Sequence, residues 1–238
     1  MNISRPDCQP SPRYTNDLLL TGTDRQSEGA AAIVGQIAHE LRQPLSAMEA
    51  IVYYLQLTVT DDPRTRAQIE KLRQLIEQSG SILSDAVHYL QAAPARPEHR
   101  DLHEALAECL SRLAAPDQNL IELDLADPFP LLNFDLTQMD HLLSTALRFC
   151  LRAGRRAHPV EVSTHVEDAR AVVSFSTAAP HFDIPTPEDL FTPFEDHPAA
   201  AAGLGLASIR RIAEAHGGTC QLSAHPGHRV TLRLELPI

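Results

Sequence analysis

Two long heptad patterns constrain the first third of this 238-residue chain more strongly than any other sequence feature. Val34, Leu41, Met48 and Leu55 recur every seven residues, and a second apolar series from Ala38 follows four residues behind the first. Apolar residues at this spacing lie along one stripe of a helix. The pattern therefore predicts a long helix over about residues 27–60.

A second heptad series follows a short helix-breaking segment. Residues 61–63, Asp-Asp-Pro, end the first pattern, and Ile69, Ile76, Leu83 and Leu90 then recur every seven residues. Each helix would be about 45 Å long at 1.5 Å per residue, and one hairpin cannot bury such a seam within a single chain. We expect an antiparallel helical hairpin over residues 27–93 that forms a four-helix homodimer. The alternative is a coiled-coil arm within one chain.

The rest of the chain divides into two short segments and one α/β domain. Residues 1–26 are rich in proline and polar residues, which favours a poorly ordered lead-in, and prolines mark 94–100 as a linker. Residues 101–238 mix helical and alternating patterns, which predicts an α/β sandwich and gives the chain an α+β fold class. Within the domain we expect helices over 101–114, 135–154 and 206–216, a strand over 119–124, and β-hairpins pairing 160–166 with 170–177 and 220–224 with 230–236.

Charge and composition limit the classes of partner. The 20 basic and 31 acidic residues give a formal charge of −11, and no basic stripe stands out, which argues against a nucleic-acid partner. No apolar run approaches the about 20 residues that span a bilayer, so we expect a cytoplasmic protein with no membrane partner. The four cysteines lack CxxC spacing and indicate buried thiols, and the histidines outside the hairpin motif, such as His88 and His165, indicate surface residues rather than metal ligands. No metal site is expected.

The segment 38–45, Ala-His-Glu-Leu-Arg-Gln-Pro-Leu, is the sharpest local feature. His39 lies roughly 120° from the centre of the helical seam, so solvent should reach its imidazole. Pro44 has no N–H, so the carbonyl of Glu40 loses its helical donor and the helix should bend there. Gln43 stands where a zinc-protease HExxH motif needs its second histidine, which excludes that class.

HELRQPL resembles the H box of the dimerisation and phosphotransfer region of two-component sensor histidine kinases. The resemblance implies that His39 is the phosphoacceptor and that a response-regulator receiver domain is the partner. A neutral imidazole is a good nucleophile, and the carboxylate of Glu40 can hold its tautomer and accept a proton. By the same resemblance, Gln43 helps to position water for dephosphorylation of the partner.

The C-terminal domain resembles the Bergerat-type ATP-binding domain, of the GHKL ATPase class, that follows this hairpin in such kinases. Gly203, Gly205 and Leu206 belong to a segment similar to the family's GLGL motif, whose backbone amides approach a phosphate at a helix N-terminus. Residues 190–194 similarly resemble the family's phenylalanine motif. The resemblance implies ATP and Mg²⁺ as cofactors.

Several positions depart from that family pattern. Thr145 stands where the family has the asparagine that coordinates Mg²⁺, and His141 stands where a second asparagine is usual. Thr177 stands where an aspartate accepts the adenine amino hydrogen, and Ala179 and His181 replace glycines. These departures predict weak or absent use of ATP.

Three functions remain open from the sequence. The first is a phosphotransferase that passes phosphate between His39 and a response-regulator aspartate in a phosphorelay. The second is an active kinase that phosphorylates His39 from ATP, and the third is a non-enzymatic pseudokinase scaffold. Thr145 and Thr177 disfavour the active kinase, whereas the intact H box disfavours the scaffold.

Overall fold

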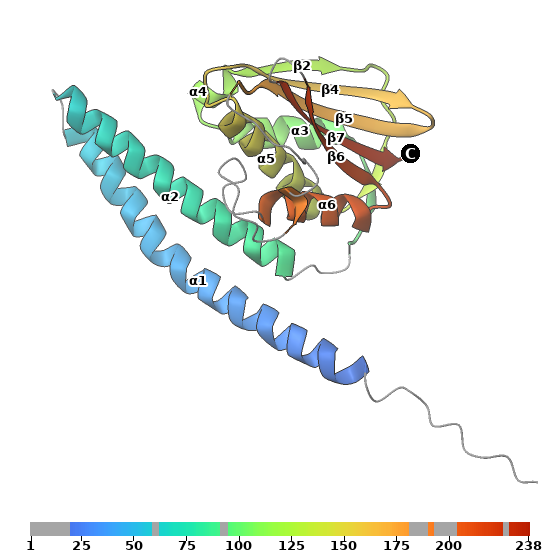
Figure 1. The fold of residues 1–238 in the computed structure, drawn as a ribbon, viewed down its shortest axis with the longest axis horizontal. Helices are drawn as coiled ribbons and strands as arrows, with labels where there is room; N and C mark the ends of the chain where they lie inside the picture. Colours follow the sequence, from blue (N-terminus) through green and yellow to red (C-terminus); the bar gives the residue numbers. More distant parts are fainter. Residues whose placement is uncertain (1–19, 59–61, 91–94, 181–189, 193–203, 226–228) are drawn as a thin grey trace, which may run out of the picture.

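A computed structural model describes residues 20–58, 62–90, 95–180, 190–192, 204–225 and 229–238. A long helical hairpin precedes an α/β domain in which helices cover one face of a sheet (Figure 1). Residues 1–19 of the predicted lead-in and residues 193–203 lie outside the described residues. In the described part of the chain, no helix combines the length and apolar character needed to cross a membrane.

The predicted hairpin is present, formed by α1 (Leu20–Thr58) and α2 (Pro63–Leu90). α1 begins at Leu20, seven residues before the start that we predicted, so residues 20–26 belong to the helix rather than to the lead-in. No proline interrupts those residues, so the helix can extend through them. Pro44 lies inside α1.

Only part of the predicted seam is covered within the hairpin. Val52 of α1 packs with Ile69 and Ile76 of α2, and these three side chains are buried. The same stripe continues over exposed apolar side chains, among them Leu41, Met48, Ile51, Leu72 and Leu75. A single hairpin therefore leaves a wide apolar face in solvent.

The described part of the domain consists of helices and strands in mixed order. The first six are β1 (Glu98–Arg100), α3 (Leu102–Ser111), α4 (Ala115–Gln118), β2 (Ile121–Leu125), β3 (Leu132–Phe134) and α5 (Leu136–Ala153). The others are β4 (Val160–Glu167), β5 (Arg170–Ala178), α6 (Leu204–Ala215), β6 (Thr219–His225) and β7 (Arg229–Pro237). Five strands form one sheet in the order β2-β4-β5-β7-β6, and β1 pairs with β3 in a small separate sheet.

The core lies between the five-stranded sheet and helices α3, α5 and α6 (Figure 1). Alternate residues of the strands point into it, among them Val162, Phe175 and Leu232, while Leu142 and Ala146 of α5 are fully buried against them. This is the period-two pattern from which both β-hairpins were predicted. The β4–β5 turn consists of two residues with positive φ, as tight hairpin turns require.

Helix caps fall where the sequence indicated. The side chain of Asp135 accepts a hydrogen bond from the backbone of Gln138, and Gly154 caps the other end of α5. The linker prediction over 94–100 was wrong in part, because Glu98–Arg100 forms β1 and pairs with β3. A strand of three residues is too short to show a recognisable alternation of apolar and polar residues. The predicted strand β2 is present, and it pairs in parallel with β4, which follows α5 in the chain.

Candidate functional site

The three predicted phosphotransfer residues lie together on the outer part of α1. His39, Glu40 and Gln43 are all exposed. Gln36 donates a hydrogen bond from Nε2 to Oε1 of Glu40, 3.0 Å away. Neither His39 nor Gln43 forms a hydrogen bond with another described residue, so the imidazole is free to meet a reactant from solvent.

The same region of α1 faces a groove between the hairpin and the domain. Arg42, Ser46 and Glu49 lie three, seven and ten residues after His39, a spacing that keeps them close to its face of the helix. They line a cavity of about 510 Å³, whose other walls come from α2, α3 and α5. His39 itself is not among the lining residues, but it precedes Arg42 by about one helical turn.

The predicted nucleotide positions lie elsewhere, where α2 packs against α5 and α6 (Figure 1). Thr145 is buried on α5, and Gly205 and Leu206 lie in the first turn of α6. Gly203 lies outside the described residues. α6 begins at Leu204, two residues before the predicted start.

Asp85 of α2 occupies the space between Thr145 and Gly205. It is only 5% exposed, and its Oδ1 lies 3.4 Å from the hydroxyl of Thr145. A Cβ added to Gly205 would lie 3.0 Å from Oδ2 of Asp85, so this glycine allows the carboxyl group to approach the backbone of α6. Sequence reasoning missed Asp85, because one acidic residue on a heptad helix looks like a solvated surface residue.

Basic side chains surround the buried carboxyl group. Arg148 lies 3.6 Å from Asp85 and donates a hydrogen bond to Oγ1 of Thr145 at 2.8 Å. Burial raises the pKa of Asp85 above its ordinary value, while the positive charges of Arg148 and Arg152 act in the opposite direction. The contact between α2 and the domain is thus a polar, buried cluster rather than an apolar one.

Two stacked histidines complete this cluster. The rings of His88 on α2 and His141 on α5 lie 3.8 Å apart and nearly parallel, and His141 shares a hydrogen bond with Ser208 of α6. Burial, followed by the charges of His88 and Arg148, lowers the pKa of His141 to about 3. Burial, followed by Arg42 and Arg148, lowers the pKa of His88, and Asp140 opposes this shift. The expectation that His88 is a surface residue holds only in part, because its ring is half-buried and stacks on His141 of α5.

Thr177, at the predicted purine position, is buried at the end of β5. Its hydroxyl donates a hydrogen bond to the carbonyl of Pro159 at 2.9 Å, so its one donor is already used within the protein. Of the two residues at the family's glycine positions, Ala179 is buried and His181 lies outside the described residues. Among the residues that the structure describes, the side chain at the predicted purine position is the hydroxyl of Thr177 and not a carboxylate.

These residues do not fit Mg²⁺-nucleotide in the arrangement that the structure has. The carboxyl group of Asp85 takes the place beside Thr145 and Gly205 that a phosphate would need, and its charge, when ionised, repels a phosphate. Thr145 offers one hydroxyl, which already accepts from Arg148. In this arrangement α2 contacts α6 and places Asp85 beside Thr145 and Gly205.

The histidine stack makes the docking of α2 sensitive to acid. A histidine whose folded pKa is lowered stabilises the folded state above its unfolded pKa of 6.5 and loses that contribution as the pH falls. For His141 the loss between pH 7 and pH 5 is about 2 kcal/mol. The raised pKa of Asp85 acts in the opposite direction, with a contribution that is complete only below pH 3.8.

We therefore expect urea unfolding to show a clear loss of stability between pH 7 and pH 5. His88→Phe keeps a stacked ring but removes one titrating group, so its stability should depend less on pH than that of the wild type. His165→Phe, at an exposed histidine on β4, is the matched control and should behave like the wild type. Equal slopes for the wild type and His88→Phe would contradict this account.

Comparisons with known proteins place the domain in context. Residues 134–238 match the family described as histidine kinase-, DNA gyrase B-, and HSP90-like ATPase. The sensor histidine kinase ZraS of Escherichia coli K12 is 22% identical over 206 residues, which cover 85% of this chain and 44% of ZraS. The histidine-protein kinase AtoS of the same strain is 24% identical over 212 residues, covering 87% of this chain and 34% of AtoS.

Solved structures share the fold. The structure of full-length ShkA in complex with AMPPNP matches with a TM-score of 0.59 at 22% identity, covering 87% of this chain and 45% of that one. The histidine kinase AdeS of Acinetobacter baumannii matches with a TM-score of 0.54 at 19% identity, covering 84% of this chain and 97% of that one. The chain spans less than half the length of ZraS and of AtoS.

Proposed function

The chain is a member of the two-component histidine kinase family and carries a GHKL-type ATPase domain, and we propose that it passes phosphate between His39 and a response-regulator aspartate. The exposed imidazole of His39 beside a groove lined by Arg42 is the observation that carries this proposal. A receiver domain enters that groove and presents its aspartyl phosphate to the histidine. Arg42, one turn along α1, offsets the negative charge of the phosphoryl group as it moves.

The transfer needs only groups that the chain and its partner supply. A nitrogen of the His39 imidazole attacks phosphorus, a P–N bond forms, and the bond between phosphorus and the aspartate carboxylate breaks. The N–H proton of the imidazole passes to Glu40 or to water. The reverse steps return the phosphoryl group to a second regulator, so no nucleotide is required.

The contact of Asp85 with Thr145 and Gly205 supports weak or absent use of ATP. The rival function is an active kinase, which the match to an ATPase family favours. In that case α2 would have to leave α5 and α6 in each cycle, so that nucleotide could reach Gly205. Incubation of the chain with a phosphorylated receiver domain, and separately with labelled ATP, tests which of the two donors is used.

We also propose that the protein works as a homodimer. Met48, Ile51, Leu72 and Leu75 line an open apolar cavity of about 440 Å³ along the hairpin, and these side chains are about half exposed in one chain. A second hairpin covers them in a four-helix bundle. Covering apolar surface contributes roughly 25 cal/mol per Å², so the exposed stripe favours association.

Light scattering should give twice the 26.1 kDa mass of one chain. Ile51→Glu should reduce the mass to that of a monomer at micromolar concentration, because it places a charge in the apolar interface. Ala50→Glu, exposed on the opposite side of α1, is the matched control and should remain dimeric. A monomeric wild type, or a dimeric Ile51→Glu variant, would rule out this interface.

A further inference from the structure

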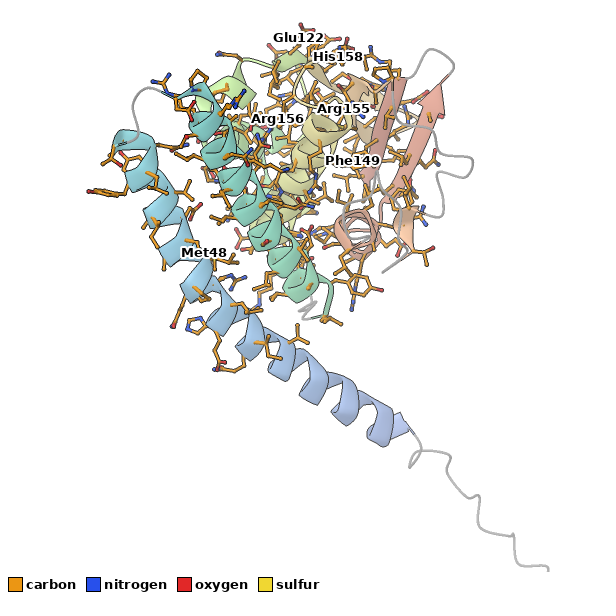
Figure 2. The ribbon with its side chains drawn as sticks, turned by 60° about the vertical axis from the view of Figure 1, so that its left-hand side comes forward. Met48, Glu122, Phe149, Arg155, Arg156 and His158 are labelled. Atoms are coloured by element: carbon orange, nitrogen blue, oxygen red, sulfur yellow. The ribbon has the colours of Figure 1, made fainter. Side chains whose placement is uncertain are left out.

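A second cavity lies between α2 and the carboxyl end of α5, and arginine dominates its lining. Four arginines occur within nine residues, at positions 148, 152, 155 and 156. All four line a cavity of about 340 Å³, to which α2 contributes Gln74, Glu77, Gln78 and Ser81. Figure 2 shows Arg156 between the first half of α2 and the end of α5, and Arg155 at that end of α5. The proposed nucleotide positions Thr145, Thr177 and Gly205 are not among its lining residues.

The arginines exceed the acidic groups that face them. Arg148 has Asp85 at 3.6 Å, and Arg156 has Asp117 at 3.0 Å and Glu77 at 3.8 Å. Glu77 is shared, because it also pairs with Arg73. The guanidinium groups of Arg152 and Arg155 form no ion pair or hydrogen bond with any residue that the structure describes, although the backbone N–H of Arg155 donates to the carbonyl of Arg152. Two positive charges thus lack a direct counter-charge in a chain whose formal charge is −11.

The environment of Arg152 disfavours its positive charge. Burial lowers its pKa, and Arg148 and Arg156 lower it further, whereas Asp85 opposes them. Arg152 is half-buried, and a guanidinium held among like charges with reduced access to water is stabilised when an anion enters beside it. The Nε atoms of Arg148 and Arg156 are also buried without a hydrogen bond to a described group, although Arg156 Nε lies near Asp117.

We propose that this arginine cavity binds a small anion with two linked phosphate groups. Guanidinium groups pair with phosphate oxygens through two parallel hydrogen bonds, and two unpaired arginines match a ligand with at least two negative charges. The side-chain amides of Gln74 and Gln78 offer further donors from α2. A bound diphosphate bridges α2 and α5 and holds the hairpin against the domain.

Isothermal titration of the whole protein with inorganic pyrophosphate at low salt tests the proposal. We expect one pyrophosphate per chain, a rise in the melting temperature, and affinity that falls as salt increases. Arg155→Met, at an exposed position, should weaken binding about tenfold or more, and Arg152→Met should do the same. Arg155→Lys keeps the charge but loses the forked geometry, so its affinity should be intermediate.

Two controls separate this site from the rest of the molecule. Arg229→Met removes an arginine that pairs with Glu161 on the sheet, and it should bind pyrophosphate like the wild type. His39→Gln should also leave binding unchanged, because the proposal does not depend on phosphotransfer. ADP without Mg²⁺ is the second probe. If ADP binds more tightly than pyrophosphate, the ligand of the cavity is a nucleoside diphosphate, and if it binds more weakly, the ligand is free diphosphate. Arg155→Met should weaken the binding of both probes. No binding by the wild type, or binding by Arg155→Met and Arg152→Met as tight as that of the wild type, would overturn the proposal.

Discussion

His39→Gln should abolish transfer of phosphate from a phosphorylated receiver domain to this protein. The imidazole is exposed on α1 and is the nucleophile that we propose, whereas an amide at that position cannot form a stable phosphoramidate. The wild type should acquire label that acid removes and base does not, as expected for phosphohistidine. His158→Gln, at a histidine between α5 and β4, is the matched control and should label normally.

Glu40→Gln distinguishes proton transfer from binding in the same assay. The amide keeps the size of the side chain but cannot accept the imidazole proton, so transfer should slow by about 10²-fold or more. Binding of the receiver domain should change little, which surface plasmon resonance can measure. Label that persists in His39→Gln would move the phosphorylated residue elsewhere and remove the basis of the proposed function.

The helices and strands that were predicted correctly are those in which a periodic apolar pattern continues over many residues or a capping residue marks the end. Heptads fixed the two helices of the hairpin, and Asp135 and Gly154 marked both ends of α5. Alternation over at least seven residues likewise identified the strands that form β4 and β5. These signals are local in the sequence, so they can be recognised without knowledge of the tertiary contacts.

The parts that were missed depend on contacts between distant segments. β1 and β3 are three residues each and exist because they pair with one another. His88 looked like a surface residue because nothing in its own helix shows that α2 packs against α5 and α6. Asp85 was missed for the same reason, and its role appears only when Thr145 and Gly205 are seen beside it.

The arginine cavity was not predicted from the sequence, for a different reason. The four arginines from 148 to 156 are visible in the sequence as a local excess of positive charge in an acidic chain. α5 carries two of them on one face, because Arg148 and Arg152 are four residues apart. Sequence alone does not show that α2 encloses them, and enclosure is what makes their charges costly.

In the Arg155→Met variant, which weakens the proposed anion cavity, calorimetry should detect no binding of Mg·ATP at micromolar concentrations. Thr177 lacks the carboxylate that would accept from adenine, a hydrogen bond worth roughly 1.5 to 3 kcal/mol. Thr145 is a poorer Mg²⁺ ligand than an amide oxygen, and Asp85 fills the space beside it. Because each 1.4 kcal/mol is about tenfold, these defects together weaken binding by a factor of about 100 or more.

Substitutions at Asp85 distinguish two causes of weak ATP binding: the space that Asp85 fills, and the missing ligands for Mg²⁺ and adenine. Asp85→Asn removes the charge but keeps the volume, whereas Asp85→Ala removes both and opens the space beside Gly205. We expect Asp85→Ala to gain about tenfold in affinity for Mg·ATP over Asp85→Asn, and the double variant with Thr145→Asn to gain more. Asp124→Ala, at an exposed acid on β2, is the control and should bind no better than the wild type. A micromolar dissociation constant for the wild type that Gly205→Asp abolishes would instead establish an active ATP site, because it would show that α2 yields to nucleotide without any substitution.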